Sequence, residues 1–291
     1  MAQTVPRLGF VAMALPGYFL GDEQCAGKRL EGIAMLEQAG YEVCAAPAVY
    51  SPEEACAAGT QLSTENVDCL FVFLTTFVAD YFVTELLKAC DKPIFIWAHD
   101  RDVTCITLVC TPLITASLKN LKKDCCVVSG EVGDAYCLQQ LFHYSRAAML
   151  KNQLYGARVG YSGHKPEIMY SMAANEYLLD RKLGITLTNI PIEDFYREAE
   201  KQDDEEVRKR WEELHPRLGC VDVRDEDGLL SIRYYLAARA QVAQKNLKAY
   251  SLNCFPNLKA KICLGIGMLN DECIGAGCEG DLHASILMTM H

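Results

Sequence analysis

Short apolar segments that alternate with longer helical patterns constrain the fold of this chain more than any other feature. Five such segments occupy residues 8–14, 41–46, 70–74, 93–98 and 125–129. They are rich in Val, Ile and Phe and are continuous rather than alternating, which is typical of strands buried on both faces of a parallel sheet. Helical patterns at residues 22–39, 76–90 and 111–121 fill the crossovers, so we predict a doubly wound α/β domain.

The same alternation resumes in the second half of the chain. A long helical pattern at residues 134–154 is followed by Gly156 and a new strand at 158–161, which places a domain boundary near residue 155. Further strands are predicted at 185–190 and 250–254, further helices at 193–214, 227–248, 258–270 and 282–290, and a glycine-rich turn at 275–281. We therefore predict two doubly wound parallel-sheet domains of the Rossmann or flavodoxin kind, residues 1–155 and 156–291.

Charge and hydropathy argue against several classes of partner. The 291 residues include 28 Lys and Arg against 38 Asp and Glu, so the formal net charge is −10. An acidic surface repels phosphate backbones and anionic lipid headgroups, so we expect neither nucleic acid nor a membrane as a partner. No apolar run approaches the ~18 residues needed to span a bilayer. The N-terminal residues lack the pattern of a secretion signal, so we expect a cytoplasmic protein.

The cysteines do not follow the spacing of a metal site or of a disulfide framework. There are 15 of them, scattered and mostly within apolar segments, and none forms a Cys-x-x-Cys pair. Structural zinc sites and disulfide-rich domains show paired, regular cysteine spacing. We therefore expect small, reduced and mostly buried thiols.

Residues 275–280 match the pattern Gly-x-Gly-x-x-Gly. A dinucleotide site needs this pattern early in a strand–helix–strand unit, with an acidic residue about 20 positions later. Only 11 residues follow Gly280, and Glu279 inside the pattern would repel a pyrophosphate. We therefore do not predict dinucleotide binding. Nucleophile-elbow, P-loop and His-Glu-x-x-His patterns are absent from the sequence.

The same glycine-rich segment presents two carboxylates just ahead of a predicted helix. Asp281 is suited to cap that helix, because its side chain can accept hydrogen bonds from the free backbone N–H groups. Glu279 precedes it on the turn and is either solvated or functional. Spacing alone favours the structural interpretation, in which Asp281 caps and Glu279 is solvated.

The segment resembles the second domain of the L-fucose and L-arabinose isomerases. The resemblance rests on Phe255-Pro256, Cys263, residues 268–271 (Met-Leu-Asn-Asp) and above all residues 276–281 (Ala-Gly-Cys-Glu-Gly-Asp), with more diffuse similarity at 31–43, 92–98 and 158–163. In that family the Glu of this turn binds the catalytic divalent metal and takes part in proton transfer. The resemblance thus implies that Glu279 is a metal ligand and catalytic residue, with Asp281 supporting it or capping the helix.

The resemblance implies an aldose–ketose isomerase that acts on a sugar through an enediol, with Mn²⁺ or a similar divalent cation, in a symmetric homo-oligomer. In the family, further metal ligands follow the Glu, one of them a His in a third domain, whereas this chain ends at His291. We therefore expect the second domain to be incomplete at its C-terminal end and the chain to be inactive alone. One subunit of a split isomerase, or a non-catalytic sugar-binding or regulatory protein, are the alternatives.

Four polar residues follow predicted strands and form a candidate substrate rim. His164 follows the strand at 158–161, His99 the strand at 93–98, Tyr18 the first strand and Thr76 the third. Parallel-sheet domains bind ligands at the carboxyl ends of their strands, so these side chains are candidates to contact a sugar. Taken singly, each is better explained by a structural role within its domain. The sequence does not identify the sugar.

Overall fold

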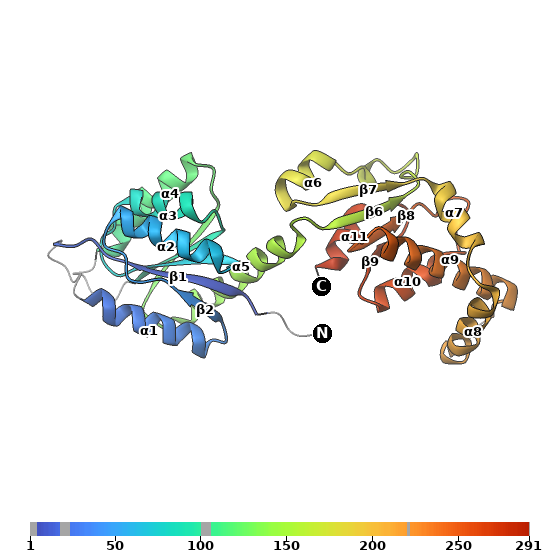
Figure 1. The fold of residues 1–291 in the computed structure, drawn as a ribbon, viewed down its shortest axis with the longest axis horizontal. Coiled ribbons are helices and arrows are strands. Elements are labelled where there is room, and N and C mark those ends of the chain that lie inside the picture. The colour runs from blue at the N-terminus through green and yellow to red at the C-terminus, as the bar shows by residue number, and fades with distance from the viewer. Residues whose placement is uncertain (1–4, 18–23, 100–105, 220–221, 291) are drawn as a thin grey trace. The chain divides into compact units, whose positions relative to one another are not determined.

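The computed structural model describes residues 5–17, 24–99, 106–219 and 222–290. The chain forms two compact units, Met1–Asn152 and Gln153–His291, each built on its own sheet (Figure 1). The division falls near the end of helix α5 (Ala135–Leu154), beside the boundary near residue 155 that the sequence suggested.

The first unit is a five-stranded parallel sheet in the order β2-β1-β3-β4-β5, which is the flavodoxin order. Its strands are β1 (Arg7–Met13), β2 (Glu42–Ala45), β3 (Cys69–Leu74), β4 (Ile94–His99) and β5 (Cys125–Gly130). Its helices are α1 (Cys25–Gln38), α2 (Pro52–Thr64), α3 (Asp80–Ala89), α4 (Thr107–Asn120) and α5. Helix α2 was not predicted from the sequence.

Helices cover both faces of this sheet, which explains why its strands are apolar throughout. Successive residues of a strand point to opposite faces. Phe10, Phe71 and Phe95 pack toward α1 and α5, and their rings stack with centroids 5.4 Å and 5.8 Å apart. Val11 and Val72 pack on the other face, toward α2, α3 and α4. Burying each such side chain contributes about 1.5–3 kcal/mol, so every position of a central strand favours an apolar residue.

The second unit is a four-stranded parallel sheet in the order β7-β6-β8-β9. Its strands are β6 (Arg158–Ser162), β7 (Thr186–Ile190), β8 (Ala249–Leu252) and β9 (Gly275–Gly277). Its helices are α6 (Glu176–Leu183), α7 (Ile192–Glu200), α8 (Asp204–Leu214), α9 (Asp225–Gln244), α10 (Cys263–Asp271) and α11 (Leu282–Thr289), with short 3₁₀ turns at Tyr170–Met172 and His215–Arg217. Two all-parallel sheets interleaved with helices confirm the predicted fold class.

Two apolar clusters sandwich this second sheet as well. Helices α7, α8, α9 and α10 contribute to one cluster, which includes Tyr250, Leu252 and Ala276 from the strands. Helix α11 contributes Leu282 and Ile286 to the other cluster, with α6 packed against it. The sheet is therefore doubly wound, and the loops at its ends are free to carry function.

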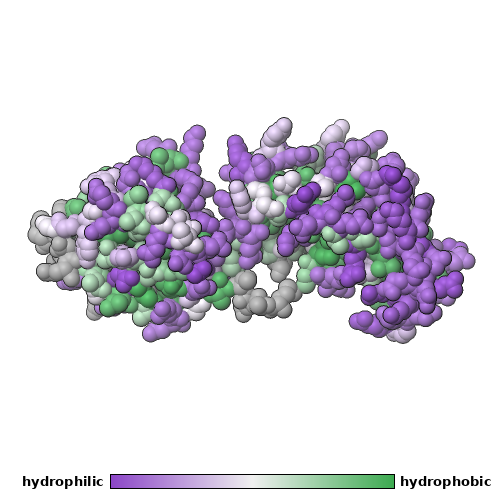
Figure 2. Space-filling view, in the orientation of Figure 1, coloured by the Kyte–Doolittle hydropathy of each residue, from purple (hydrophilic) through white to green (hydrophobic). Residues whose placement is uncertain are grey.

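The single charged helix predicted at residues 193–214 is wrong, because the chain breaks between α7 and α8. The Asp203 side chain caps α8 by accepting a hydrogen bond from the backbone N of Glu206 at 3.0 Å. Arg233 of α9 donates to the carbonyl of Gln202 at 2.8 Å and so holds the break in place. The charged face of α8 is exposed, as the hydrophilic surface at the right of Figure 2 shows.

Within the described residues, no helix is both long and apolar enough to cross a membrane. All 13 cysteines of that part of the chain are free, and most of them are buried or half-buried, whereas Cys56, Cys263, Cys273 and Cys278 are exposed.

Candidate functional site

The loops that follow β6, β8 and β9 come together at the carboxyl edge of the second sheet. The backbone N of Asn253, just after β8, donates to the carbonyl of Ser162 at the end of β6 at 2.9 Å. The backbone N of Gly280 donates to the carbonyl of Leu252 at 3.1 Å. A Cβ built on Gly280 would lie 3.6 Å from the carbonyl oxygen of His164. Residues 278–281, called the 278–281 turn below, therefore lie beside the loop that carries His164.

Residues 275–277 form the edge strand β9, so the turn predicted at 275–281 is wrong over these three residues. Both glycines of the strand are needed because α11 packs directly against it. A Cβ on Gly275 would lie 2.4 Å from the carbonyl oxygen of Ser285, and one on Gly277 would lie 2.5 Å from that of Asp281. Real Cβ atoms cannot approach a backbone oxygen so closely. The glycine pattern thus serves helix–strand packing.

The Asn270 side chain forms the hydrogen bonds that a neighbouring strand would otherwise form with the outer edge of β9. Its side-chain oxygen accepts a hydrogen bond from the backbone N of Ala276 at 2.9 Å, and its Nδ2 donates to the Ala276 carbonyl at 3.0 Å. Buried backbone groups left without partners would cost about 1–3 kcal/mol each. This side chain therefore fixes the short strand that leads into the 278–281 turn.

Glu279 adopts a left-handed backbone conformation, with φ of +56°, and Gly280 after it has φ of +74°. A left-handed conformation costs an L-residue other than glycine about 1–2 kcal/mol. Several other non-glycine residues with positive φ, such as Asn66 and Asn246, lie two positions after the last residue of a helix, where this conformation is common. Glu279 lies instead between a strand and a helix. Such strain persists where surrounding contacts impose it, and it clusters at functional sites.

The side chain of Glu279 is half-buried. Within the described residues, its carboxylate has no hydrogen-bond or ion-pair partner. Two backbone hydrogen bonds hold the turn. The Gly280 N donates to the Leu252 carbonyl at the end of β8, and the Asp281 N donates to the Cys278 carbonyl at 3.0 Å. The turn therefore holds a carboxylate at the sheet edge without using it in packing.

Asp281 is the N-cap residue of α11, as the sequence pattern suggested. Its Oδ1 accepts a hydrogen bond from the backbone N of Ala284 at 2.9 Å. The Ser285 hydroxyl donates to the Asp281 carbonyl at 2.9 Å. Because the Asp281 carboxylate is engaged with the helix, it fixes the direction in which the chain leaves Glu279.

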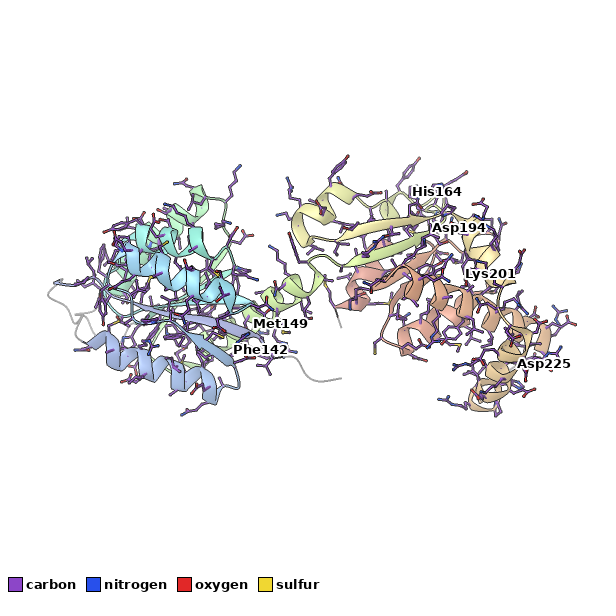
Figure 3. All side chains as sticks on the ribbon, in the orientation of Figure 1. Phe142, Met149, His164, Asp194, Lys201 and Asp225 are labelled. Carbon is purple, nitrogen blue, oxygen red and sulfur yellow. The ribbon has the colours of Figure 1, made fainter. Side chains whose placement is uncertain are left out.

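His164 is exposed on the loop after β6 (Figure 3), and its neighbour Lys165 is half-buried. The Cα of Lys165 lies 3.5 Å from a Cβ built on Gly280, so the backbone of Lys165 borders the turn. The Lys165 Nζ donates a hydrogen bond to the Pro166 carbonyl at 3.4 Å and lies 5.1 Å from the centre of the Tyr170 ring. Tyr161 also borders Gly280, and burial raises the pKa of its hydroxyl. Sequence reasoning missed Tyr161, which lies in the last part of β6, and Lys165, which lies three residues after the strand.

Two thiols meet beside Glu279. The Sγ atoms of Cys254 and Cys278 lie 3.2 Å apart, and either can donate a hydrogen bond to the other. Although Cys278 as a residue is exposed, desolvation of its thiol, together with the hydrogen bond to Cys254, raises the pKa of Cys278 to about 12. Sequence spacing gave no sign of this contact between the two thiols.

The remaining rim candidates belong to the first unit. His99 is buried at the end of β4, with its ring edge-on to Phe73 and its carbonyl accepting from the Thr107 hydroxyl at 2.6 Å. It borders a cavity of about 400 Å³ that Lys28 and Glu131 also line.

Thr76 is fully buried, and its Oγ1 accepts from the backbone N of Leu15 at 3.0 Å and donates to the carbonyl of Phe77 at 3.0 Å. Its hydroxyl is therefore used within the unit. Tyr18 lies outside the described residues.

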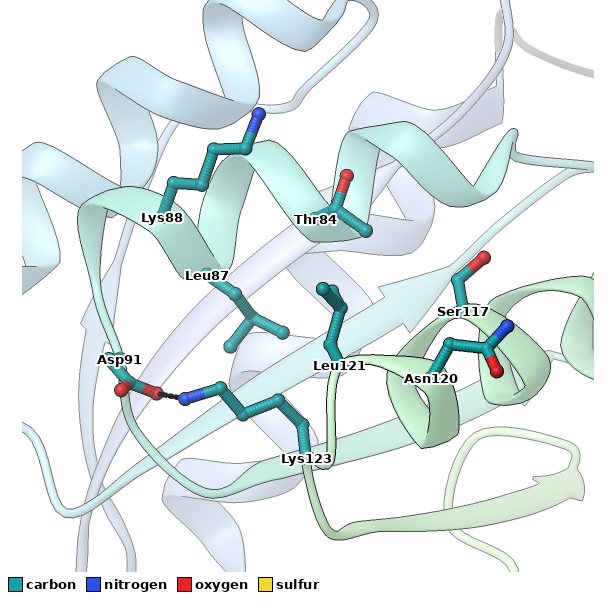
Figure 4. A pocket seen from close by; sticks show the side chains of 8 residues that line it. All are labelled: Thr84, Leu87, Lys88, Asp91, Ser117, Asn120, Leu121 and Lys123. Carbon is teal, nitrogen blue, oxygen red and sulfur yellow. Dashed lines mark hydrogen bonds and ion pairs between the residues drawn. The ribbon is translucent and has the colours of Figure 1, made fainter.

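Another hollow of the first unit, of about 600 Å³, lies between the ends of α3 and α4 (Figure 4). These helix ends lead into β4 and β5, so the hollow is at the amino edge of the sheet. Both of its lysines are paired, Lys123 with Asp91 and Lys88 with Glu85. Ligands of parallel-sheet domains bind at the opposite edge, so this hollow is not the candidate site.

A metal ligand set is not assembled in the stretches 5–17, 24–99, 106–219 and 222–290, where no group of three or more His, Cys, Asp or Glu side chains is placed to hold an ion. A carboxylate suits a hard divalent cation, but these residues offer Glu279 without companions. They therefore do not fit a complete metal centre by themselves.

No protein-family model matches this chain. It is similar to the sulfoquinovose isomerase of Priestia aryabhattai, with 20% identity over 232 residues that cover 77% of this chain and 52% of the relative. It is also similar to the sulfoquinovose isomerases of Clostridium sp. (strain MSTE9), with 24% identity over 55% of this chain and 37% of the relative, and of Alkalicoccus urumqiensis, with 22% identity over the same shares. The chain spans about half the length, or less, of the curated relatives it matches.

Proposed function

We propose that this protein is an aldose–ketose sugar isomerase in which Glu279 moves a proton between C1 and C2 of the sugar. The observation that carries the proposal is the strained, half-buried Glu279 at the carboxyl edge of a parallel sheet. The similarity to proteins named sulfoquinovose isomerase supports the same class of reaction.

The proposed chemistry needs one base that serves both carbons. The Glu279 carboxylate takes the proton from C2 of the open-chain aldose, the C2–H electrons form the C1=C2 bond, and the C1=O1 π electrons move to O1. The O2 hydroxyl proton passes to O1, the C2=O2 bond forms from the O2 electrons, and the C1=C2 π electrons take the proton back from Glu279 at C1, which leaves the ketose. A positioned general base of this kind contributes about 10²–10⁴-fold to the rate. The fixed backbone of the turn lets one carboxylate face both carbons without reorganisation.

Mn²⁺ or a similar divalent cation is part of this proposal. When bound, such an ion would stabilise negative charge on the sugar oxygens. The described residues do not complete a ligand set for such an ion. Chelation followed by restoration with Mn²⁺ tests its involvement directly.

The relatives' name makes sulfoquinovose the first sugar to test, ahead of L-fucose and L-arabinose. The sulfo group is an anion, and the backbone of half-buried Lys165 borders the turn that holds Glu279. We propose that the Lys165 ammonium group turns from the Pro166 carbonyl to the sulfonate of a bound sugar, because a hydrogen bond between two charged groups is stronger than one to a neutral carbonyl. We also propose a symmetric homo-oligomer, which sedimentation velocity would test.

The test follows deuterium exchange at C2 of the three sugars in D₂O, with and without Mn²⁺. It uses the 291-residue chain alone and the same chain fused to the part of the Priestia aryabhattai relative that the chain does not match. We expect exchange with at least one sugar and a loss of 100-fold or more in Glu279→Gln. The matched control, Glu212→Gln, removes an exposed carboxylate on α8 and should retain full exchange.

Full exchange by the Glu279→Gln protein would refute the role of that residue. Sugar binding without exchange in both forms would refute the isomerase and favour a non-catalytic sugar-binding protein.

A further inference from the structure

We propose that Cys254 and Cys278 are a redox pair that closes a reversible disulfide beside Glu279 when the protein meets a two-electron thiol oxidant, such as hydrogen peroxide. The 3.2 Å contact between their sulfur atoms carries this inference. It does not depend on the proposed isomerase function, because the disulfide can be measured directly.

The backbone already brings the two cysteines together. In the register of β8 and β9, Ser251 pairs with Gly277, so Cys254 and Cys278 follow paired positions by three residues and by one. The hydrogen bond from the Gly280 N to the Leu252 carbonyl holds the two loops against each other. A disulfide needs a separation of about 2.05 Å. The sulfurs therefore have to close by about 1 Å, which small side-chain rotations can supply.

The two thiols differ in exposure, which assigns their roles. Cys278 is exposed and reacts with the oxidant first, whereas Cys254 is 4% exposed and reacts second, with the oxidised Cys278. Cys278 first releases its thiol proton to water, and the thiolate so formed attacks one peroxide oxygen, so an S–O bond forms, the O–O bond breaks and hydroxide leaves. Cys278 is now a sulfenic acid, and the hydroxide takes up the released proton to become water.

Cys254 then completes the reaction. Its sulfur attacks the Cys278 sulfur, the S–S bond forms, and the S–O bond breaks. The leaving hydroxide takes the Cys254 proton and becomes a second water. Two thiols have lost two electrons, and one peroxide has become two waters. A small dithiol reductant reverses the change by thiol–disulfide exchange.

The bond would fix the residue directly before Glu279 to the end of β8. The 278–281 turn would then have two covalent anchors, its own chain and the sulfur bridge. We therefore expect oxidation to change the setting of the Glu279 carboxylate. If the proposed isomerase function is correct, exchange at C2 should fall on oxidation and return with reductant.

The test oxidises the reduced 291-residue protein with hydrogen peroxide, blocks the remaining thiols by alkylation and maps the peptides by mass spectrometry. Cleavage by trypsin and then before Asp271 separates Cys263 from Cys278. We expect a linked peptide pair containing Cys254 and Cys278, 2 Da lighter than its reduced parts, that dithiothreitol releases. In Cys254→Ser, Cys278 should stop at a sulfenic acid that dimedone traps.

Cys263→Ser is the matched control, because Cys263 is exposed in the same unit and close enough to add to the raised pKa of Cys278. This variant should still form the bond. Linkage of Cys278 to Cys263 instead, or reduced Cys254 and Cys278 after the exposed Cys56 has been oxidised, would overturn the proposal. Mapping the wild-type protein decides the outcome even if a serine variant fails to fold.

Discussion

Replacing Glu279 by glycine should make the second unit more stable than replacing it by alanine, the reverse of the usual order. Glu279 has φ of +56°. This conformation costs alanine about 1–2 kcal/mol, and glycine pays no such cost. Glycine pays instead about 0.4–1 kcal/mol for its freer unfolded chain. The difference predicts that Glu279→Gly is about 1 kcal/mol more stable than Glu279→Ala.

Urea unfolding, followed by tryptophan fluorescence, measures this difference. The chain has two tryptophans, Trp97 in the first unit and Trp211 in the second, so a Trp97→Phe background leaves Trp211 as the reporter. In thermal unfolding, the same difference corresponds to roughly 3 °C in Tm. Glu279→Gln keeps both the strain and the shape of the side chain, so its stability should match that of the wild type.

Two other positions serve as controls for the backbone argument. Ala260 has φ of +64° and is exposed, so Ala260→Gly should also stabilise the unit. Ala243 lies on the exposed face of α9, so Ala243→Gly should destabilise it by about 1 kcal/mol. If Glu279→Gly unfolds at lower urea than Glu279→Ala while these controls behave as expected, the strain assigned to Glu279 is refuted.

Two further predictions concern packing and pH in the second unit. Gly277→Ala should lower the free energy of unfolding by about 1–3 kcal/mol, because its Cβ would meet the Asp281 carbonyl at 2.5 Å. Gly267→Ala, in open space on α10, should raise it by about 0.5–1 kcal/mol. Equal urea midpoints for the two variants would contradict this. Burial and then the hydrogen bond to Glu272 raise the pKa of Tyr235 from 10.0 to about 12, so the stability this residue contributes is complete below pH 10.0 and is lost as the pH rises through about 12. Urea titrations between these pH values should therefore show a shallower fall in Tyr235→Phe, and parallel curves for the two proteins would rule this out.

The sequence by itself determined the architecture, because burial on both faces leaves a continuous apolar run in each central strand. Phe71 and Val72 are adjacent, point to opposite faces and are both fully buried, which is why β3 could be located from sequence. The start of α11 at Asp281 could also be predicted from the sequence, because capping depends on the next three residues alone.

The interactions that decide the candidate site join residues far apart in the chain. Cys254 and Cys278 are 24 positions apart and meet because β8 pairs with β9. The break between α7 and α8 depends on Arg233, which lies on another helix.

The glycines of β9 show most clearly that a local sequence pattern does not reveal contacts between distant residues. Residues 275–280 read as a nucleotide-binding motif or a loop, and only the approach of α11 shows that Gly275 and Gly277 are there to admit a helix backbone. The left-handed conformation of Glu279 follows from that approach, because the chain must turn from a buried edge strand into a helix within four residues. Local periodicity reports which faces are buried, whereas the strain on one carboxylate is set by contacts that exist only once the sheet has formed.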